Sequence, residues 1–70
     1  MKLKINGEEE TIDRETLTVT DLLTVKEVKM PDMVSVELNG EMLERDTFET
    51  TSLKEGDEIE FLYFMGGGMI

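Results

Sequence analysis

The sequence predicts an α+β domain in which one helix packs across one face of a mixed sheet of four to five strands. Three observations support this fold class. Segments near both ends of the chain alternate polar and apolar residues, which is the period of a half-buried strand. One central segment has helical spacing of its apolar residues, and two Asn-Gly dipeptides are typical of tight hairpins. The predicted order of elements is therefore β-β-α-β-β-β.

The first two strands form a hairpin. Lys2–Ile5 alternates polar and apolar side chains, as a half-buried strand does. Asn6 and Gly7 follow, and both tolerate the positive φ angles that a two-residue turn requires. Residues 8–12 are the return strand. Its three consecutive glutamates are poor strand formers, so we expect this strand at an exposed edge of the sheet.

The central segment predicts an amphipathic helix of about three turns. Thr18 is a suitable N-cap at its start. Pro31 sets its end, because the residue before a proline is pushed out of the α region. The apolar residues recur at helical spacing and share one side of the helix: Val19, Leu22, Leu23, Val25 and Val28.

Three further strands complete the sheet. Residues 33–38 alternate apolar and polar side chains, Asn39-Gly40 is a second hairpin turn, and residues 41–43 are a short return strand. In the irregular stretch that follows, Phe48 fills one end of the core. Residues 58–64 form the strongest strand. Its two apolar faces indicate a central position, where we expect it to pair in parallel with the first strand.

The composition excludes several classes of function. The 70 residues include 17 acidic and 7 basic side chains, a formal charge of -10, and neither His nor Cys. The sequence therefore offers no thiolate nucleophile, imidazole base or usual zinc site. The acidic balance argues against binding to nucleic acid or anionic membranes and favours a basic protein partner. With no apolar signal region at the N-terminus and no Cys, we expect a cytoplasmic protein.

Three consecutive glycines, Gly66, Gly67 and Gly68, follow directly after the last predicted strand. Glycine has no side chain and a high ordering cost, so we expect a folded domain over residues 1–65 and a flexible tail over residues 66–70. A tail without Cβ atoms is thin enough to enter a narrow channel. For glycines alone, a frayed end is the simpler interpretation.

These elements occur in a specific order along the whole chain. The chain resembles the ThiS family of small sulfur-carrier proteins, which is related to the MoaD carriers and to ubiquitin. The resemblance implies a ubiquitin-like β-grasp fold and a role as sulfur donor in thiamine thiazole synthesis. It rests on the Asn6-Gly7 hairpin, Thr18-Val19-Thr20-Asp21-Leu22-Leu23, and residues 34–40, 53–61 and 64–68.

The resemblance also implies a chemistry and a set of partners. The terminal glycine carboxylate, on Gly68 or Gly67, is adenylated and then converted to a thiocarboxylate. Gly66, Gly67 and Gly68 thread into the partner. The chain is then a carrier and not an enzyme, and it binds no cofactor itself. A ThiF-like adenylyltransferase uses ATP and magnesium, a cysteine desulfurase or rhodanese-like protein donates persulfide sulfur, and thiazole synthase receives the sulfur.

The sequence departs from the family pattern after Gly68, where Met69-Ile70 follows. An amide bond to Met69 blocks adenylation of Gly68. A protease that trims Met69-Ile70 resolves this conflict. The alternatives are an inactive carrier, another use of the intact terminus, or an artefactual addition.

Two surfaces near the tail are candidates for partner docking. Glu58 and Glu60 belong to an acidic run suited to a basic partner, with solubility as the plain alternative. Tyr63 and Met65 suit an exposed apolar patch, with core packing as the alternative. Two other functions stay open. One is a β-grasp carrier for another acceptor, such as molybdopterin, an amino-acid precursor or a protein lysine. The other is a non-catalytic interaction module.

Overall fold

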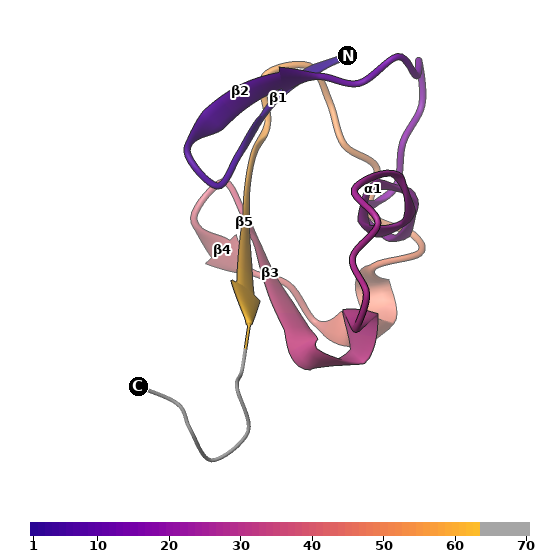
Figure 1. The fold of residues 1–70 in the computed structure, drawn as a ribbon, viewed down its shortest axis with the longest axis vertical. Helices are drawn as coiled ribbons and strands as arrows, with labels where there is room; N and C mark the ends of the chain where they lie inside the picture. Colours follow the sequence, from indigo (N-terminus) through magenta and orange to yellow (C-terminus); the bar gives the residue numbers. More distant parts are fainter. Residues whose placement is uncertain (64–70) are drawn as a thin grey trace.

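The computed structural model describes residues 1–63, and in this part five strands form one sheet with the order β2-β1-β5-β3-β4 (Figure 1). The predicted α+β class with a mixed sheet and one helix is confirmed. Two short 3-10 helices that the sequence pattern did not predict lie in the connections. The elements are β1 Lys2–Ile5, β2 Glu8–Thr11, α1 Val19–Val25, η1 Pro31–Met33, β3 Val34–Leu38, β4 Glu41–Met42, η2 Arg45–Thr47 and β5 Glu58–Tyr63.

The last strand, β5, lies at the centre of the sheet. It pairs in parallel with β1, with Ile5 opposite Ile59, and antiparallel with β3, with Val36 opposite Phe61. The predicted parallel pairing of the first and last strands is therefore confirmed. The predicted exposed edge is also confirmed, since β2 pairs only with β1 within the described sheet.

Both predicted hairpin turns have the expected backbone. Asn6 and Gly7 have φ angles of 53° and 86°, and Asn39 and Gly40 have φ angles of 52° and 87°. Two consecutive residues at positive φ match the right-handed twist of the strands that they connect. The local sequence therefore sets the register of both hairpins.

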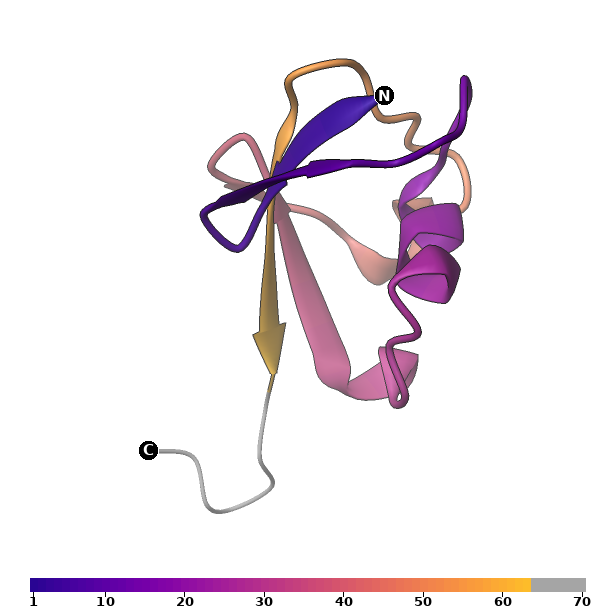
Figure 2. The same ribbon diagram turned by 45° about the horizontal axis from the view of Figure 1, so that its top comes forward.

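Helix α1 covers one face of the sheet, and the core fills the space between them (Figures 1 and 2). Leu22 and Val19 are fully buried on the inner side of α1, and Phe48 is buried as predicted. The core side chains come from the three central strands β1, β5 and β3, from α1 and from the connecting segments: Leu3, Ile5, Ile12, Leu17, Val19, Leu22, Leu23, Val34, Val36, Phe48, Leu53, Ile59 and Phe61.

The other face of the sheet is open in the described part of the chain. Along β5 only Ile59 and Phe61 are buried, while Leu62 is 36% exposed. Apolar residues on both faces of this strand predicted a central position in the sheet, and this position is confirmed. The apolar residues of the second face are not covered in the described part of the chain, because the one described helix lies on the other side of the sheet.

The helix is shorter than predicted. It ends at Val25 after seven residues, or about two turns, and Pro31 does not end it. Pro31 instead occupies the first turn of η1, where its fixed φ suits a helix start. At the N-terminus the prediction is confirmed: Asp21 N–H donates to Thr18 Oγ1 at 3.1 Å, and the Asp21 carboxylate accepts from Thr18 N–H at 3.1 Å.

A Schellman motif explains the early end of α1. Val28 N–H donates to the carbonyl of Leu23, and Glu27 N–H donates to that of Thr24, each at 3.0 Å. This arrangement requires a left-handed residue, and Glu27 takes that position with a φ of 55°. Glycine usually occupies such a site, so the sequence carried no signal for the stop.

Replacement of Glu27 by glycine is expected to stabilise the protein by about 0.5–1 kcal/mol. The left-handed conformation costs a non-glycine residue about 1–2 kcal/mol, and glycine's entropy in the unfolded chain offsets about half of this gain. Chemical denaturation measures the change. Glu44→Gly is the control, since Glu44 is exposed at a φ of -76° and gains nothing from glycine. Equal effects of both substitutions would contradict the strain argument.

Asp57 fixes the start of β5. It is 7% exposed, and its carboxylate accepts from Lys54 N–H at 2.7 Å and from the Asn39 side chain at 3.1 Å. Asn39 Oδ1 in turn accepts from Glu58 N–H at 2.9 Å. The turn before β5, which has Gly56 at a φ of 86°, is thereby tied to the second hairpin.

Candidate functional site

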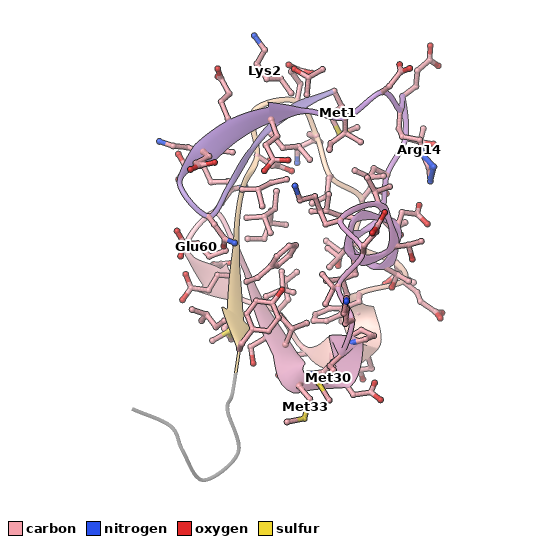
Figure 3. All side chains as sticks on the ribbon, in the orientation of Figure 1. Met1, Lys2, Arg14, Met30, Met33 and Glu60 are labelled. Atoms are coloured by element: carbon pink, nitrogen blue, oxygen red, sulfur yellow. The ribbon has the colours of Figure 1, made fainter. Side chains whose placement is uncertain are left out.

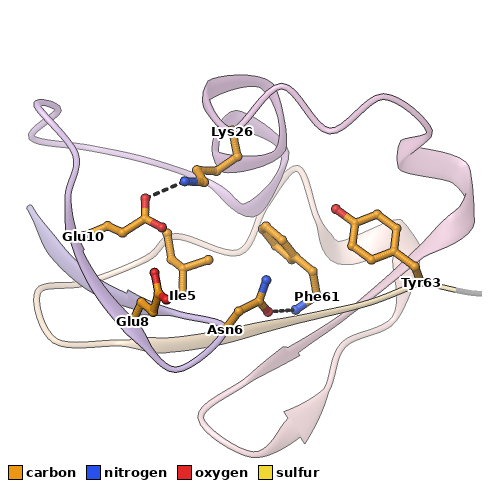
Figure 4. A pocket seen from close by; sticks show the side chains of 7 residues that line it. All are labelled: Ile5, Asn6, Glu8, Glu10, Lys26, Phe61 and Tyr63. Carbon is orange, nitrogen blue, oxygen red and sulfur yellow. Dashed lines mark hydrogen bonds and ion pairs between the residues drawn. The ribbon is translucent and has the colours of Figure 1, made fainter.

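The end of β5 is the point from which the chain continues toward the three glycines. The main-chain pairing of β5 with β1 ends at Ile59, but the Asn6 side chain extends it, because Asn6 Oδ1 accepts from Phe61 N–H at 2.8 Å (Figure 4). On its other side, β5 pairs with β3 as far as Tyr63, which lies opposite Val34. The fold therefore holds β5 firmly up to Tyr63, the last described residue.

The open face of the sheet carries an apolar and acidic surface near this end. The register places Met42, Glu37 and Glu60 opposite one another across β4, β3 and β5, and Leu62 lies two residues beyond Glu60 on the same face. Met42 is 56% exposed and Leu62 is 36% exposed. We call Met42, Glu37, Glu60 and Leu62 the open-face patch.

The predicted docking residues fall on two different faces. Glu58 and Glu60 are exposed on the open face, where Glu58 lies opposite Lys4 of β1. Tyr63 has the parity of Ile59 and Phe61, so it lies on the helix side of the sheet, 50% exposed. The alternation of a strand, read from residue numbers alone, already separates Tyr63 from the two glutamates. Met65, Gly66, Gly67 and Gly68, and the predicted domain boundary after residue 65, lie outside the described residues.

The sequence pattern did not indicate that Leu62 and Met42 form one surface. Leu62 counted only as an apolar residue on the second face of the last strand, and Met42 lies in a short strand with little apolar pattern. Leu62 lies in β5 and Met42 lies in β4, and β3 lies between these two strands in the sheet. The two residues share a face because the register pairs Glu37 of β3 with both Glu60 and Met42. This arrangement depends on contacts between distant parts of the chain.

A cavity of about 310 Å³ lies on the helix side of the sheet (Figure 4), and it is lined by Ile5, Asn6, Glu8, Glu10, Lys26, Phe61 and Tyr63. Within it, Lys26 Nζ contacts Glu10 Oε1 at 2.5 Å. Both side chains are about one-third exposed, so this ion pair contributes at most about 1 kcal/mol. It joins the edge strand β2 to the end of α1.

The structure gives no indication of a metal site in the described part of the chain. Residues 1–63 contain no group of three or more side chains arranged to bind a metal ion. Glu8 and Glu10 point to the helix side, whereas Glu9 lies opposite Lys4 on the open face, so the three consecutive glutamates do not converge. No helix in this part is long and apolar enough to cross a membrane.

Comparisons with known proteins agree on one family. The ThiS family model matches residues 2–68. The sulfur carrier protein ThiS of Bacillus subtilis is 32% identical over 66 residues, covering 94% of this chain and 98% of that protein. A thiazole synthase of Magnetococcus marinus is 35% identical over 68 residues, covering 97% of this chain. The chain spans only 20% of the length of that synthase.

A solved structure has the same fold. The crystal structure of the thiamine biosynthesis protein ThiS from Geobacter metallireducens superposes with a TM-score of 0.88 at 54% sequence identity, covering 97% of this chain and all of that one. The predicted ubiquitin-like β-grasp fold is confirmed by this match. Because the family model matches this chain from β1 through the three glycines, the chain belongs to the ThiS family.

Proposed function

We propose that this ThiS-family sulfur carrier is activated at the carboxylate of Gly68 and then carries sulfur there as a thiocarboxylate for the thiazole of thiamine. One observation carries the proposal. The family match extends through Gly66, Gly67 and Gly68 and stops before Met69. The matched segment thus ends at the residue whose carboxylate has to react.

The chemistry explains why a carrier needs no reactive side chain. A carboxylate oxygen of Gly68 attacks the α-phosphorus of ATP, and pyrophosphate leaves. A persulfide on the partner attacks the resulting acyl adenylate, and AMP leaves. A second thiol of the partner cleaves the sulfur–sulfur bond, which releases the thiocarboxylate. The partner supplies ATP, magnesium and thiols, and this chain, without His or Cys, supplies the carboxyl group.

The fold suits this division of roles. The buried core of β1, β3, β5 and α1 holds the end of β5 at a fixed place, and the glycines begin three residues after Tyr63. The partner therefore grips a rigid domain and receives a thin segment at a defined distance from it. Positioning of this kind is a large part of the rate advantage of an enzyme over solution.

We assign docking of the ThiF-like adenylyltransferase to the open-face patch. Leu62 and Met42 provide exposed apolar side chains. Methionine is one of the residue types that are enriched at protein–protein interfaces. Glu37 and Glu60 flank them with negative charge. A partner surface with an apolar centre and a basic rim fits this patch, and screening by salt should slow its association.

Thiazole synthase is the proposed sulfur acceptor. The Magnetococcus marinus thiazole synthase contains a region similar to nearly all of this chain within a much longer polypeptide. Two functions that occur in one polypeptide in one organism commonly cooperate as separate proteins in another. The persulfide donor, a cysteine desulfurase or rhodanese-like protein, and a trimming protease complete the set of partners, with cytoplasmic ATP as the energy source.

Adenylation of two chain lengths tests the proposal. A protein that ends at Gly68 is expected to release pyrophosphate when mixed with a ThiF-like enzyme, magnesium and ATP. The chain that continues to Ile70 is expected to release none, because its Gly68 carbonyl is an amide. Equal release from both proteins, or none from either, would contradict activation at Gly68.

A further inference from the structure

The edge of β5 that faces β1 is only partly paired within residues 1–63. The ladder between the two strands ends at Ile59, because the chain turns away from β5 at Asn6-Gly7. Asn6 extends the pairing by one step: its N–H donates to the Ile59 carbonyl at 2.9 Å, and its Oδ1 accepts from Phe61 N–H at 2.8 Å. The next two main-chain groups along this edge are the Phe61 carbonyl and the Tyr63 N–H.

These two groups have no hydrogen-bond partner in the described part of the chain. The main-chain groups of alternate residues point to the same side of a strand, so Phe61 and Tyr63 face the β1 side as Ile59 does, whereas Leu62 faces Ser35 of β3. Beyond the Asn6 side chain, nothing within residues 1–63 pairs with this side of β5. An unpaired strand edge is a template for pairing with another chain.

The side chains on either face of this edge indicate what a visiting strand would meet. On the helix side lies the cavity of about 310 Å³, where Lys26 contacts Glu10 and Glu8 has no ion pair within the described residues (Figure 4). On the other face lie Leu62 and Glu60, and Figure 3 shows Glu60 on the side of the sheet away from α1. The edge therefore has an acidic cavity on one face and the open-face patch on the other.

We propose that a short extended segment of the adenylyltransferase pairs in parallel with the end of β5, in line with β1. One residue of the segment binds both free groups: its N–H donates to the Phe61 carbonyl, and its carbonyl accepts from Tyr63 N–H. Asn6 makes the same kind of bridge one step earlier, between Ile59 and Phe61. This inference rests on the function proposed above and extends the docking assigned to the open-face patch.

The register sets the chemistry of the segment. Side chains alternate along a strand, so the residue that bridges Phe61 and Tyr63 lies beside Leu62 and places its side chain on the open face. The residues before and after it point to the helix side, into the cavity that contains Glu8. An apolar residue next to a lysine or arginine fits both faces, because the apolar side chain covers Leu62 and the basic one pairs with Glu8.

The structure favours a strand of a partner over a second copy of this chain. Strand addition gains affinity from main-chain hydrogen bonds and specificity from alternate side chains, and β5 is already held in an extended conformation by β3. Little ordering of β5 is therefore needed on binding. Two copies of this chain, each with a formal charge of -10, repel one another.

Two substitutions at Tyr63 test the pairing. Tyr63→Pro removes the side chain and the N–H, and Tyr63→Ala, the matched control, removes the side chain alone. The N–H of Tyr63 points away from β3, so proline at this position leaves the ladder between β3 and β5 intact. In surface plasmon resonance without ATP, Tyr63→Pro is expected to bind a ThiF-like enzyme about 10-fold more weakly than Tyr63→Ala. Equal affinities of the two variants overturn the proposal.

Amide hydrogen exchange of the unaltered chain of residues 1–70 gives a second readout that needs no variant. The Tyr63 amide is expected to exchange rapidly in the free protein and about 10-fold or more slowly in the presence of the ThiF-like enzyme. The Leu62 amide is the internal control, because it faces β3 and should be protected in both states. This measurement decides the question even if Tyr63→Pro fails to fold.

Every other exchange result contradicts the pairing. A Tyr63 amide that is already protected in the free protein shows that the edge is not open. Protection that requires only a higher concentration of this chain shows that a second copy is the occupant. An unchanged Tyr63 amide in the presence of an enzyme that adenylates the chain ending at Gly68 overturns this inference alone. Conversely, protection of Tyr63 without any adenylation leaves the pairing standing and overturns activation at Gly68.

Discussion

Replacing Gly67 and Gly68 by alanine, in a protein that ends at residue 68, is expected to lower the rate of adenylation by about 100-fold or more. Each substitution adds a methyl group to a segment that has to enter a narrow channel and place its carboxylate against ATP. A displacement of about 1 Å from a reactive geometry can reduce a rate by two orders of magnitude. Pyrophosphate release with a ThiF-like enzyme measures the effect.

The same double variant should unfold at an unchanged temperature, because the core that the structure describes is built from residues 3–61 and a glycine has no side chain to contribute to it. Gly40→Ala is the matched control. Gly40 has a φ of 87° in the second hairpin, so alanine there costs about 1 kcal/mol of stability but leaves the reacting end of the chain unaltered. Adenylation of the tail variant at the normal rate would show that the glycines are not threaded.

Leu62→Asp is expected to weaken association with the adenylating enzyme by about 10- to 30-fold. A charge placed among apolar side chains at the centre of an interface loses its water without gaining a partner, and residues at such centres commonly account for 1–2 kcal/mol or more of binding. Leu62 is exposed in the free protein, so the substitution leaves the core intact. Surface plasmon resonance with the adenylating enzyme measures the affinity.

Val25→Asp is the control for this prediction. Val25 is 37% exposed, close to the 36% of Leu62, but it lies on α1 on the other side of the sheet. Both variants should remain folded, and only Leu62→Asp should weaken binding. If Val25→Asp weakens binding and Leu62→Asp does not, the helix side is the docking face and the assignment to the open-face patch is wrong.

Local sequence determined most of the fold. The two Asn-Gly turns, the Thr18 cap and the alternation of β1, β3 and β5 each act over a few residues, so a pattern of side chains predicts them. The end of α1 was missed for a physical reason. It depends on a left-handed Glu27, a residue type that gives no signal of that conformation, whereas Pro31 gives a strong but misleading one.

The candidate site was predictable only in part. The glycines follow β5 directly in the sequence, so their relation to the last strand could be read from it. The open-face patch combines side chains from three strands, and its existence depends on which face α1 covers. Periodicity identifies the two faces of a strand but does not identify the one that remains open. The unpaired edge at the end of β5 has the same non-local origin, because it depends on where β1 turns away from β5.

Mass spectrometry of the protein isolated from its native cells shows whether Gly68 is the reactive end of the chain. A chain that ends at Gly68 is expected, with a fraction of the molecules heavier by the exchange of one carboxylate oxygen for sulfur. Treatment with an alkylating reagent should label that fraction, since this chain has no cysteine to compete. A chain that retains Met69 after Gly68 in all molecules and carries no added sulfur, in cells that are making thiamine, would contradict this expectation.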